Sequence, residues 1–466
     1  MLDPQQSIVS KTCSKTGFGK VPFKGKFLLA KGTYEGEEIV FKLAKNKKSI
    51  DSVQVLKPHL KRNTTECPHF AECGGCALLG LNIDAQLEWK EKMIQELFLA
   101  DQEKIQTIIS NPAPHYYRNK VEFTFSQNLK MEKKLGFNQF GSRGFAFSTQ
   151  SCLLIPKWMI QAKLFVEKLF IDHPIDAFYL PKMTGILKNL VLRSNQDLSE
   201  GIVALVVQDT KALSDAFLKE FVEGLETLFQ GNIQLSYFLI ENKVQKGVPT
   251  KIDVTHLYGK TKIKEVMEFN IDGLNFNLEF MINSTSFFQP NPSTAKLIYQ
   301  KSIQLLDICD EDVVLDLYCG SGTFGMVASK FAKKVIGIEL NESAIIDAKK
   351  LAEINQIKNI EFFAGDAKIQ IKNVVDYKIN KMIIDPPRAG LDPSVIETIL
   401  QIDPVKMVYV SCNPMTQKND VEILKQNGFE VETIVAVDQF THTPHIENIV
   451  VLKNSKSRYN QLSNHE

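Results

Sequence analysis

Hydrophobic and polar positions alternate in a regular way in the last third of the chain. Short apolar runs are separated by longer segments with helical periodicity, and the runs lie at residues 313–317, 334–339, 360–363, 381–384 and 407–410. Buried strands that alternate with helices predict a parallel, doubly wound sheet with right-handed crossovers. The ligand of such a sheet is expected at the carboxyl ends of its strands.

A different pattern occupies the first 60 residues. Apolar runs at 25–30, 37–43 and 52–56 are short, and Gly32 and Gly36 separate the first two. Short strands punctuated by glycine are typical of a small β-barrel.

Between these two regions the pattern is mixed. A helix is predicted at 85–99, strands at 121–125 and 201–207, and a second helix at 211–229. The predicted fold class is therefore multidomain α/β. A small β-barrel at 1–60 precedes a mixed α/β domain at 61–270, and a Rossmann-like doubly wound sheet follows at 271–466.

Charge is distributed unevenly along a chain that is nearly neutral as a whole. The 466 residues carry a net charge of +1, which on its own argues against a polyanionic partner. Between Lys11 and Arg62, however, thirteen Lys or Arg stand against four Asp or Glu. Such a segment is either a solvated lysine-rich face or a surface for nucleic acid, and the threefold excess favours nucleic acid.

The remaining composition is that of a soluble globular protein, with 44% hydrophobic and 23% charged residues. No run of 18 or more apolar residues occurs, so no membrane span is predicted. Residues 1–6 lack the basic start and apolar core of a signal peptide, so the expected location is cytoplasmic. In that reducing compartment, clustered cysteines are expected to serve metal binding or catalysis.

Three cysteines gather in ten residues. Cys67, Cys73 and Cys76 flank a Gly-Gly turn, and Cys152 is a distant fourth. Four thiolates can bind either Zn²⁺ or an iron–sulfur cluster, and the spacing leaves both open.

A glycine-rich turn follows the first strand of the doubly wound sheet, at residues 316–325. It lacks the Gly-Lys-Ser/Thr of a P-loop and the spacing of a dinucleotide turn. Glu339 ends the second strand, where a carboxylate can accept both hydroxyls of a ribose, and Asp366 follows the third strand at a place suited to an adenine. Turn, strand order and acidic residue are similar to those of S-adenosylmethionine-dependent methyltransferases; a Rossmann-like domain for another nucleotide is the alternative. Cys319, within the turn, is expected to be a packed small residue.

Two further motifs follow the fourth and fifth strands. The first is Asp385-Pro-Pro-Arg-Ala-Gly-Leu391, and the second is Ser411-Cys412-Asn413-Pro414. Cys412 lies at the ligand-binding rim of the sheet, which predicts a nucleophile. Near the end of the chain, Glu447 is the candidate general base. His442 and His445 are expected to bind RNA, to orient Glu447, or to be ordinary polar loop residues.

These motifs, in this order and with His445-Ile-Glu447, resemble the RNA uracil-5-methyltransferase family over essentially the whole chain. The resemblance implies that Cys412 is the nucleophile and Glu447 the proton acceptor. It implies cofactor contacts at Gln289, Tyr318, Glu339, Asp366 and Asp385, with the target uracil as the alternative partner of Asp385. One departure is Thr441, where the family usually has Pro; we expect a small change of the loop and no loss of activity.

The resemblance also implies a [4Fe-4S] cluster on Cys67, Cys73, Cys76 and Cys152, as in members that act on large-subunit ribosomal RNA. The basic N-terminal module loosely resembles the family's TRAM domain. Together they predict 23S ribosomal RNA as the substrate. The resemblance implies S-adenosylmethionine and the cluster as cofactors, and a monomer is the expected active form. In His115-Tyr-Tyr-Arg-Asn-Lys120, aromatic and basic residues suit single-stranded RNA; a plain strand-entry turn is the alternative.

Three other functions stay open at this point. The first is methylation of tRNA uridine by the same mechanism, and the second is a non-catalytic RNA-binding factor that kept the fold. The third is cytosine-5 methylation of RNA, which is disfavoured because such enzymes place a Cys in the segment that reads Asp385-Pro-Pro-Arg here.

Overall fold

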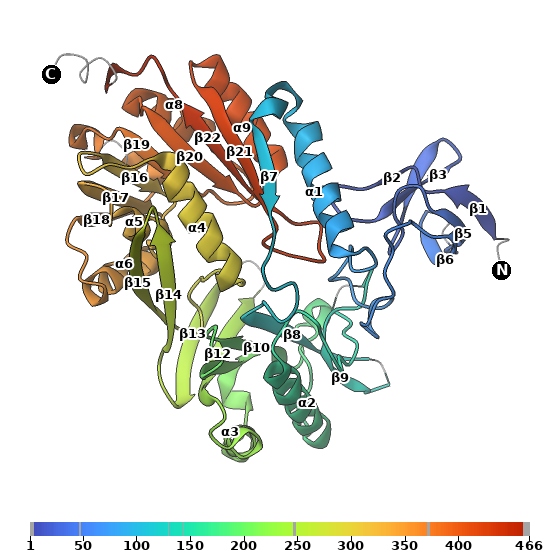
Figure 1. Cartoon of the computed structure of the whole chain (residues 1–466). Coiled ribbons are helices and arrows are strands. Elements are labelled where there is room, and N and C mark those ends of the chain that lie inside the picture. Colours follow the sequence, from blue (N-terminus) through green and yellow to red (C-terminus); the bar gives the residue numbers. More distant parts are fainter. Residues whose placement is uncertain are drawn as a thin grey trace.

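The computed structural model describes residues 4–45, 48–128, 130–142, 144–245, 248–370 and 373–459. Its largest unit is an eight-stranded sheet with the order β18-β17-β16-β19-β20-β22-β21-β7. Strands β18 to β20 run parallel, while β22 is antiparallel to β20 and β21. The predicted fold class is confirmed: a mainly parallel sheet of the methyltransferase type, with separate smaller β units (Figure 1).

The elements of this unit are as follows. Its strands are β7 (Ile105–Ile109), β16 (Val313–Leu317), β17 (Lys334–Glu339), β18 (Ile360–Ala364), β19 (Lys381–Ile384), β20 (Lys406–Ser411), β21 (Glu430–Val437) and β22 (Glu447–Lys453). Its helices are α4 (Pro292–Leu306), α5 (Thr323–Ala328), α6 (Glu342–Ile354), α7 (Ala367–Gln370), α8 (Pro393–Ile402) and α9 (Pro414–Gln426), with a 3-10 turn at Val375–Tyr377.

Both faces of this sheet are buried, which explains the nearly continuous apolar runs in the sequence. Along β16, Val314 packs into the core on one face, while Leu315 and Leu317 pack into the core on the other. The strand order reverses between β16 and β19, because the chain proceeds outward through β17 and β18 before it returns. Tyr318 and Asp385 therefore stand at the point where doubly wound sheets bind their ligands.

The central region holds a six-stranded sheet with the order β13-β12-β11-β10-β8-β9. Its strands are β8 (Lys120–Gln127), β9 (Lys133–Gly136), β10 (Leu187–Ser194), β11 (Glu200–Val207), β12 (Gln234–Gln245) and β13 (Val248–Tyr258). Helices α2 (Lys157–Asp172) and α3 (Asp215–Phe229) share one hydrophobic core with this sheet. Short 3-10 turns lie at Leu180–Lys182 and Thr210–Ala212.

A long hairpin, β14 (Ile263–Ile271) and β15 (Leu274–Ile282), spans the predicted domain boundary at residue 270. Every second residue of β14 is buried, and that face packs against α4. The hairpin thus contributes to the core of the C-terminal unit.

The N-terminal domain consists of two three-stranded sheets that pack around Val9, Val21, Ala30, Ile39 and Phe41. Its strands are β1 (Gln5–Ile8), β2 (Lys11–Thr12), β3 (Gly19–Phe23), β4 (Lys26–Ala30), β5 (Glu38–Leu43) and β6 (Ile50–Lys57). In Figure 1 this domain stands apart from the large sheet, with α1 (Ile83–Leu97) between them.

One segment lies outside the division expected from the sequence. α1, the 3-10 segment Leu99–Lys104 and β7 fall in the stretch assigned to the central domain, but β7 is the edge strand of the eight-stranded sheet, parallel to β21. α1 packs against α9 and β21 beside it. The sequence pattern did not reveal β7, because a five-residue strand that pairs with residues more than 300 positions away has no local signature. Within the described part of the chain, no helix is long and apolar enough to cross a membrane.

Candidate active site

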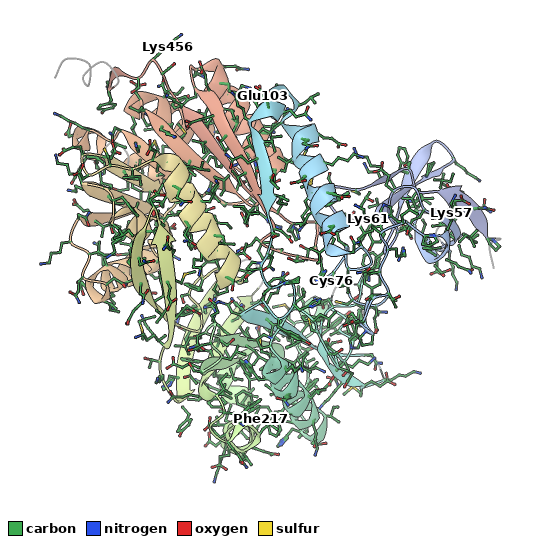
Figure 2. All side chains as sticks on the ribbon, viewed as in Figure 1. Lys57, Lys61, Cys76, Glu103, Phe217 and Lys456 are labelled. Carbon is green, nitrogen blue, oxygen red and sulfur yellow. The ribbon has the colours of Figure 1, made fainter. Side chains whose placement is uncertain are left out.

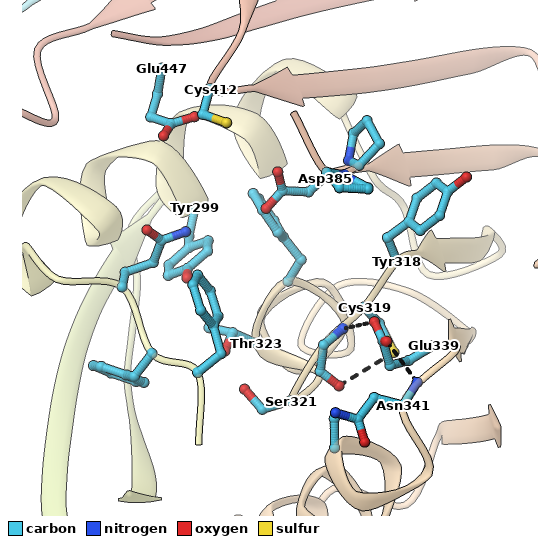
Figure 3. A pocket seen from close by; sticks show the side chains of 18 of the residues that line it. Tyr299, Tyr318, Cys319, Ser321, Thr323, Glu339, Asn341, Asp385, Cys412 and Glu447 are labelled. Carbon is cyan, nitrogen blue, oxygen red and sulfur yellow. Dashed lines mark hydrogen bonds between the residues drawn. The ribbon is translucent and has the colours of Figure 1, made fainter. Parts of the chain in front are cut away.

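A cavity of about 520 Å³ opens at the carboxyl ends of the parallel strands (Figure 3). Six of the seven residues predicted for catalysis and cofactor binding line it: Gln289, Tyr318, Glu339, Asp385, Cys412 and Glu447. They come from six places in the sequence. Tyr318, Glu339, Asp385 and Cys412 meet because parallel strands end at one edge of the sheet, and the antiparallel β22 starts at the same edge with Glu447. Other residues that line it include Tyr299, Cys319, Gly320, Asn341, Arg388 and Phe440.

The glycine-rich turn forms one wall of the cavity. Tyr318, Gly320 and Gly322 have φ values of +65°, +54° and +79°, in the left-handed region that favours glycine. A Cβ on Gly322 would lie 2.7 Å from the ring of Phe362, so a larger residue cannot fit without a shift. The amide of Gly325 donates to Asp316 Oδ2 at 2.7 Å, which fixes the start of α5.

Glu339 faces this turn. Its Oε2 accepts a hydrogen bond from the Gly320 amide at 3.1 Å, and its Oε1 accepts one from Asn341 at 2.8 Å. The carboxylate is therefore held at the cavity wall, with lone pairs still available to a ligand. Asp366, by contrast, does not line the cavity; it is exposed, and its Oδ1 accepts from the Lys368 amide at 2.9 Å.

Strand register brings Cys412 and Glu447 together. β20 and β22 are antiparallel, and Ser411 at the end of β20 pairs with Asn448 near the start of β22. Cys412 and Glu447 are the next residues outward along the two strands, and both side chains reach the cavity (Figure 3). The Cys412 thiol and the Glu447 carboxylate, which belong to different sequence motifs, are therefore neighbours at the cavity.

Two carboxyl groups of the cavity, Asp385 and Glu447, have raised pKa values because they are buried. Glu447 is 6% exposed, and burial together with nearby Asp385 raises its pKa well above the usual range, while Arg388 acts in the opposite direction. Burial raises the pKa of Asp385 to about 7. Burial and Glu447 also raise the pKa of the Cys412 thiol, and Arg388 opposes this effect by a hydrogen bond and by its charge. Arg388 is therefore the group that favours the thiolate.

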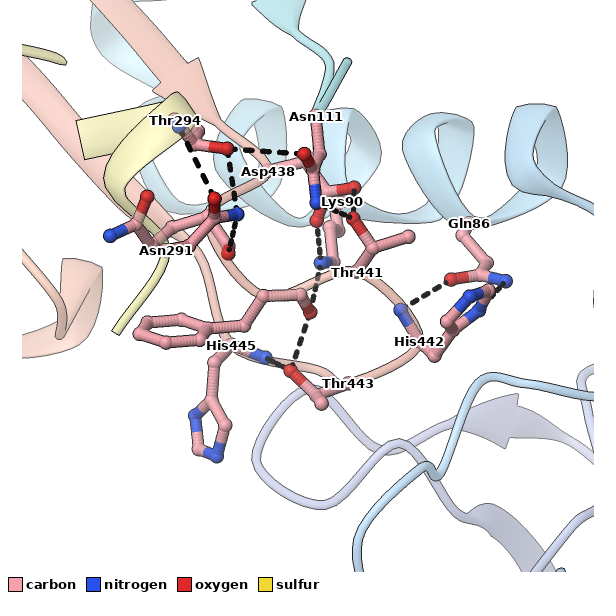
Figure 4. A network of polar contacts seen from close by, with 12 residues as sticks. Gln86, Lys90, Asn111, Asn291, Thr294, Asp438, Thr441, His442, Thr443 and His445 are labelled. Carbon is pink, nitrogen blue, oxygen red and sulfur yellow. Dashed lines mark hydrogen bonds and ion pairs between the residues drawn. The ribbon is translucent and has the colours of Figure 1, made fainter. Parts of the chain in front are cut away.

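Residues 438–446, which lead into Glu447, are held by a buried polar network (Figure 4). Lys90 of α1 and Asp438 form an ion pair with side chains 0% and 1% exposed. Thr441 Oγ1 donates to Asp438 Oδ2 at 2.7 Å and accepts from Asn111 Nδ2 at 3.0 Å. A proline, which the family usually has at position 441, could make neither hydrogen bond. Thr441 therefore adds two hydrogen bonds to this loop. Unchanged activity with Thr441 stays a prediction.

The same loop also reaches the side of the cavity that Gln289 lines. Asn291 Nδ2 donates to the Gln439 carbonyl at 3.0 Å, and Gln439 Nε2 donates to Gln289 Oε1 at 3.2 Å. Gln289 and Glu447 are therefore linked by one loop, although they stand 158 positions apart in the sequence.

The two histidines of the loop differ in their surroundings. His442 is buried with φ +69°, its Nδ1 lies 3.1 Å from Gln86 Nε2, and burial lowers its pKa to about 4. Its ring stacks on His115, with centroids 5.2 Å apart. His445 lies near Arg388, with 3.4 Å between His445 Nδ1 and Arg388 Nη2. Neither histidine lines the cavity that contains Glu447.

The four predicted cysteine ligands surround a separate cavity of about 30 Å³. Burial raises the pKa of the Cys73, Cys76 and Cys152 thiols, and the nearby cysteines add to the rise. Lys31 of the N-terminal domain donates to the carbonyls of Cys73 and Ala71. Among the described residues, no group of three or more His, Cys, Asp or Glu is close enough for a metal ion.

The cysteine loop lies where the N-terminal domain, α1 and the central region meet, near the label of Cys76 in Figure 2. Tyr34 of the N-terminal domain donates to the Ala77 carbonyl at 3.1 Å. On its other side, the Leu78 amide donates to the His442 carbonyl at 2.9 Å. The loop therefore touches both the N-terminal domain and the loop that carries Glu447.

The sequence analysis assigned no role to Tyr299 or Asp316, which the structure places at the cavity and beneath its glycine-rich turn. Tyr299 of α4 is buried at the cavity, and burial and Asp385 raise its pKa. Asp316 is buried beneath the turn, its Oδ1 has no partner among the described residues, and burial raises its pKa to about 7. Asp316 had a sequence signal, a carboxylate inside an apolar strand, and Tyr299 had none. Arg118, which belongs to the segment expected to contact RNA, lies over the ring of Phe440, 5.6 Å from its centroid. Cys319 is buried among apolar side chains of α6, as expected of a packed residue.

Comparison with known proteins matches this geometry. The family model described as tRNA (Uracil-5-)-methyltransferase matches residues 250–455. A protein of Protochlamydia amoebophila described as an uncharacterized RNA methyltransferase is 35% identical, over 89% of this chain and 96% of that protein. Another from Clostridium tetani is 32% identical, over 90% and 91%. The Pyrococcus abyssi tRNA (uracil-54, C5)-methyltransferase, solved with S-adenosyl-L-homocysteine, aligns with a TM-score of 0.73 and 25% identity, over 96% of this chain and 100% of that one.

Fold, cavity and relatives thus agree on the class of RNA methyltransferases. Within this class, the chain belongs to the tRNA (uracil-5-)-methyltransferase family.

Proposed function

We propose that this protein transfers a methyl group from S-adenosylmethionine to carbon 5 of a uridine in RNA, through a covalent bond between Cys412 and carbon 6. The observation that carries the proposal is the cavity in which Cys412, Glu447 and Asp385 face the glycine-rich turn and Glu339. A nucleophile, a base and a nucleotide-binding wall are the parts that this reaction needs.

The wall of the cavity fits the cofactor. Its volume of about 520 Å³ lies in the range of small-molecule sites. Glu339 presents a carboxylate for the ribose hydroxyls, while Gln289, Tyr318 and Asp385 complete the proposed binding set; Asp366 is at most an outer contact because it is exposed outside the cavity. When bound, the cofactor supplies an electrophilic methyl group. The solved relative with S-adenosyl-L-homocysteine supports this choice.

The protein's own residues supply nucleophilic and base catalysis. Cys412 loses its proton and forms a bond from Sγ to carbon 6 of uracil, which makes carbon 5 nucleophilic. After carbon 5 gains the methyl group, Glu447 takes the carbon 5 proton and the Sγ–C6 bond breaks. Arg388 favours the thiolate, and the raised pKa of Glu447 makes it a stronger base than an exposed carboxylate.

A covalent trap tests this mechanism. RNA that carries 5-fluorouridine has fluorine where the proton must leave, so the adduct through Cys412 is expected to persist on a denaturing gel. Absence of any adduct with cellular RNA, together with full methylation activity of Cys412→Ala, would refute the mechanism. No methylation by the wild-type protein, with RNA binding and function intact in Cys412→Ala, would favour a non-catalytic RNA-binding factor. Nucleoside analysis of the product separates 5-methyluridine from 5-methylcytidine.

The proposed substrate is 23S ribosomal RNA. The basic N-terminal segment and the four gathered cysteines support it, since the family resemblance links these features to ribosomal RNA. Transfer RNA is the second candidate, because the solved relative is a tRNA (uracil-54, C5)-methyltransferase. Mapping of 5-methyluridine in ribosomal and transfer RNA, with and without the gene, decides between them.

The four cysteines are proposed to hold a [4Fe-4S] cluster. They surround one cavity and come from two segments, 67–76 and 152, which suits a ligand that ties the chain together. In such a cluster each of the four thiolates binds a different iron. The reaction needs no redox step, so the proposed role is structural. Absorbance near 400 nm in anaerobically purified protein is the expected sign, and colourless protein with bound zinc would contradict it.

The proposed division of labour follows the predicted domains. Residues 1–60 act as a TRAM-like RNA-binding barrel, 61–270 as a cluster-bearing RNA-binding region and 271–466 as the methyltransferase domain. A cytoplasmic monomer is the proposed active form, which size-exclusion chromatography with light scattering checks.

A further inference from the structure

A second cavity, of about 460 Å³, adjoins the first at Cys412 and Arg388, which line both. It contains none of the residues assigned to the methyl donor. Its other lining residues are Ser14, Lys15, Met93, Leu97, Asn413, Pro414, Met415, Pro444, His445 and Ile446.

This cavity is assembled from distant parts of the chain. The turn with Ser14 and Lys15 belongs to the N-terminal domain, Met93 and Leu97 to α1, and Met415 to the start of α9. The parts are fixed in place by specific contacts. An ion pair of 2.6 Å joins Lys11 to Glu96 of α1.

The turn itself is tightly built. The Gly17 amide donates to the Cys13 carbonyl at 2.7 Å, and Gly17 has φ +69°. A Cβ at Gly17 would meet Ala77 at 2.8 Å and Pro444 at 3.5 Å, so the turn lies directly on the loop that carries Glu447. Lys15 is thus presented at the cavity by a defined backbone.

The lining has the chemistry of a nucleotide site. Methionine, leucine and proline side chains provide apolar surface for a base, and methionine sulfur makes favourable contacts with aromatic rings. Lys15 is exposed, and no carboxylate among the described residues pairs with it. No Asp or Glu of the described chain lines the cavity. An apolar floor beside an uncompensated cation suits a stacked base with its phosphate.

Continuity with the active site identifies the occupant. A uracil that reaches Cys412 and the methyl donor fills the first cavity, so the second, which shares Cys412 and Arg388, is open to what is attached to that uridine. We infer that the second cavity binds the base of the nucleotide next to the target uridine in single-stranded RNA, with Met93 and Met415 against the base and Lys15 at a phosphate. The inference rests on the proposed function and names a recognition site for its substrate.

Adduct formation with three synthetic RNA pools tests this inference. Each pool has one central 5-fluorouridine within random flanks, and two pools carry an abasic residue directly 5′ or directly 3′ of it. For the wild-type protein, one of the two abasic pools is expected to react about tenfold more slowly than the intact pool, because stacking of one base is worth about that factor. Met415→Ala should slow the intact pool similarly and leave that abasic pool nearly unchanged.

Matched variants separate this site from general effects. Lys15→Ala should slow adduct formation with all three pools, and Lys219→Ala on the distant helix α3 should not. Met131→Ala, exposed in the turn between β8 and β9, is the control for Met415→Ala. Equal rates for the three pools, or a Met415→Ala loss that persists undiminished on both abasic pools, would overturn the inference while the proposed function stands. No adduct of the wild-type protein with any pool would overturn the proposed function itself.

Discussion

The cavity at the strand ends and the cysteine cavity both bury ionisable groups, but they differ in volume and in the nearest cation. The first holds about 520 Å³ and has Arg388 beside Cys412 and Glu447. The second holds about 30 Å³, and Lys31 of the N-terminal domain lies near its thiols. In both, burial raises the pKa of the thiols. The first cavity is large enough to admit a substrate, whereas the second is far smaller.

The largest expected effect is the loss of the catalytic thiol. Cys412→Ala should lower the methylation rate by at least about 1000-fold, because no other nucleophile lines the cavity at that position and nucleophile knock-outs have effects of this size or larger. Single-turnover methylation of RNA measures it. Cys309→Ala changes an exposed cysteine and should keep full activity. A Cys412→Ala protein that methylates RNA at the normal rate would show that the first cavity does not use this thiol as a nucleophile.

Glu447→Gln should separate the two halves of the reaction. The amide cannot accept the carbon 5 proton, so turnover should fall about 100-fold or more, and methylated RNA should accumulate on Cys412. A denaturing gel with radiolabelled methyl donor detects the adduct. Rapid turnover without adduct would remove Glu447 from the role of base.

Cys76→Ser tests the cysteine cavity. If this cavity holds a cluster, the variant should lose the absorbance near 400 nm and several kcal/mol of stability, because the binding free energy of a structural metal site adds directly to the free energy of folding. Iron content and thermal unfolding are the measurements. Cys13→Ser, outside the cavity, is the control. Unchanged iron content in Cys76→Ser would contradict the assignment.

Lys90→Met tests the network that holds the Glu447 loop. It leaves Asp438 buried without its partner, so the free energy of unfolding should fall by about 3–5 kcal/mol. Lys92→Met, also on α1, removes an exposed pair with Glu35 at 3.4 Å and should cost less than about 1 kcal/mol. Urea unfolding compares the two. Similar losses in both variants would mean that burial does not distinguish these pairs.

The smallest expected effect is on the way the stability of the protein depends on pH. The pKa of Asp316 is about 7 in the folded protein and 3.8 as its ordinary value. Its contribution to stability is therefore fully present below about pH 3.8 and is lost as the pH rises through 7. Thermal unfolding between pH 5 and 8 should show a decline that Asp316→Asn reduces by a few degrees. Asp392→Asn, at an exposed helix cap, should leave the slope unchanged.

Much of the fold and of the site could be predicted from the sequence, because their signals are local. The apolar runs at 313–317 and 334–339 became β16 and β17, and the motifs around Asp385 and Cys412 follow strands whose ends must meet at one edge. β7 could not be predicted in this way, since it becomes part of the sheet only by pairing with β21. The position of Asp366 after β18 suggests a cofactor contact, which stays a prediction; in the structure its exposed side chain accepts a hydrogen bond from the Lys368 amide.

The sequence by itself determined the chemistry available to this protein: a thiol, a carboxylate and a glycine-rich turn, each at a strand end. Only the tertiary structure decided how these groups act on one another. Register between β20 and β22 made Cys412 and Glu447 neighbours, and burial then raised their pKa values. Packing of the N-terminal turn on Pro444 formed the second cavity. Burial and long-range pairing depend on the whole chain being folded, so no local pattern can encode them alone.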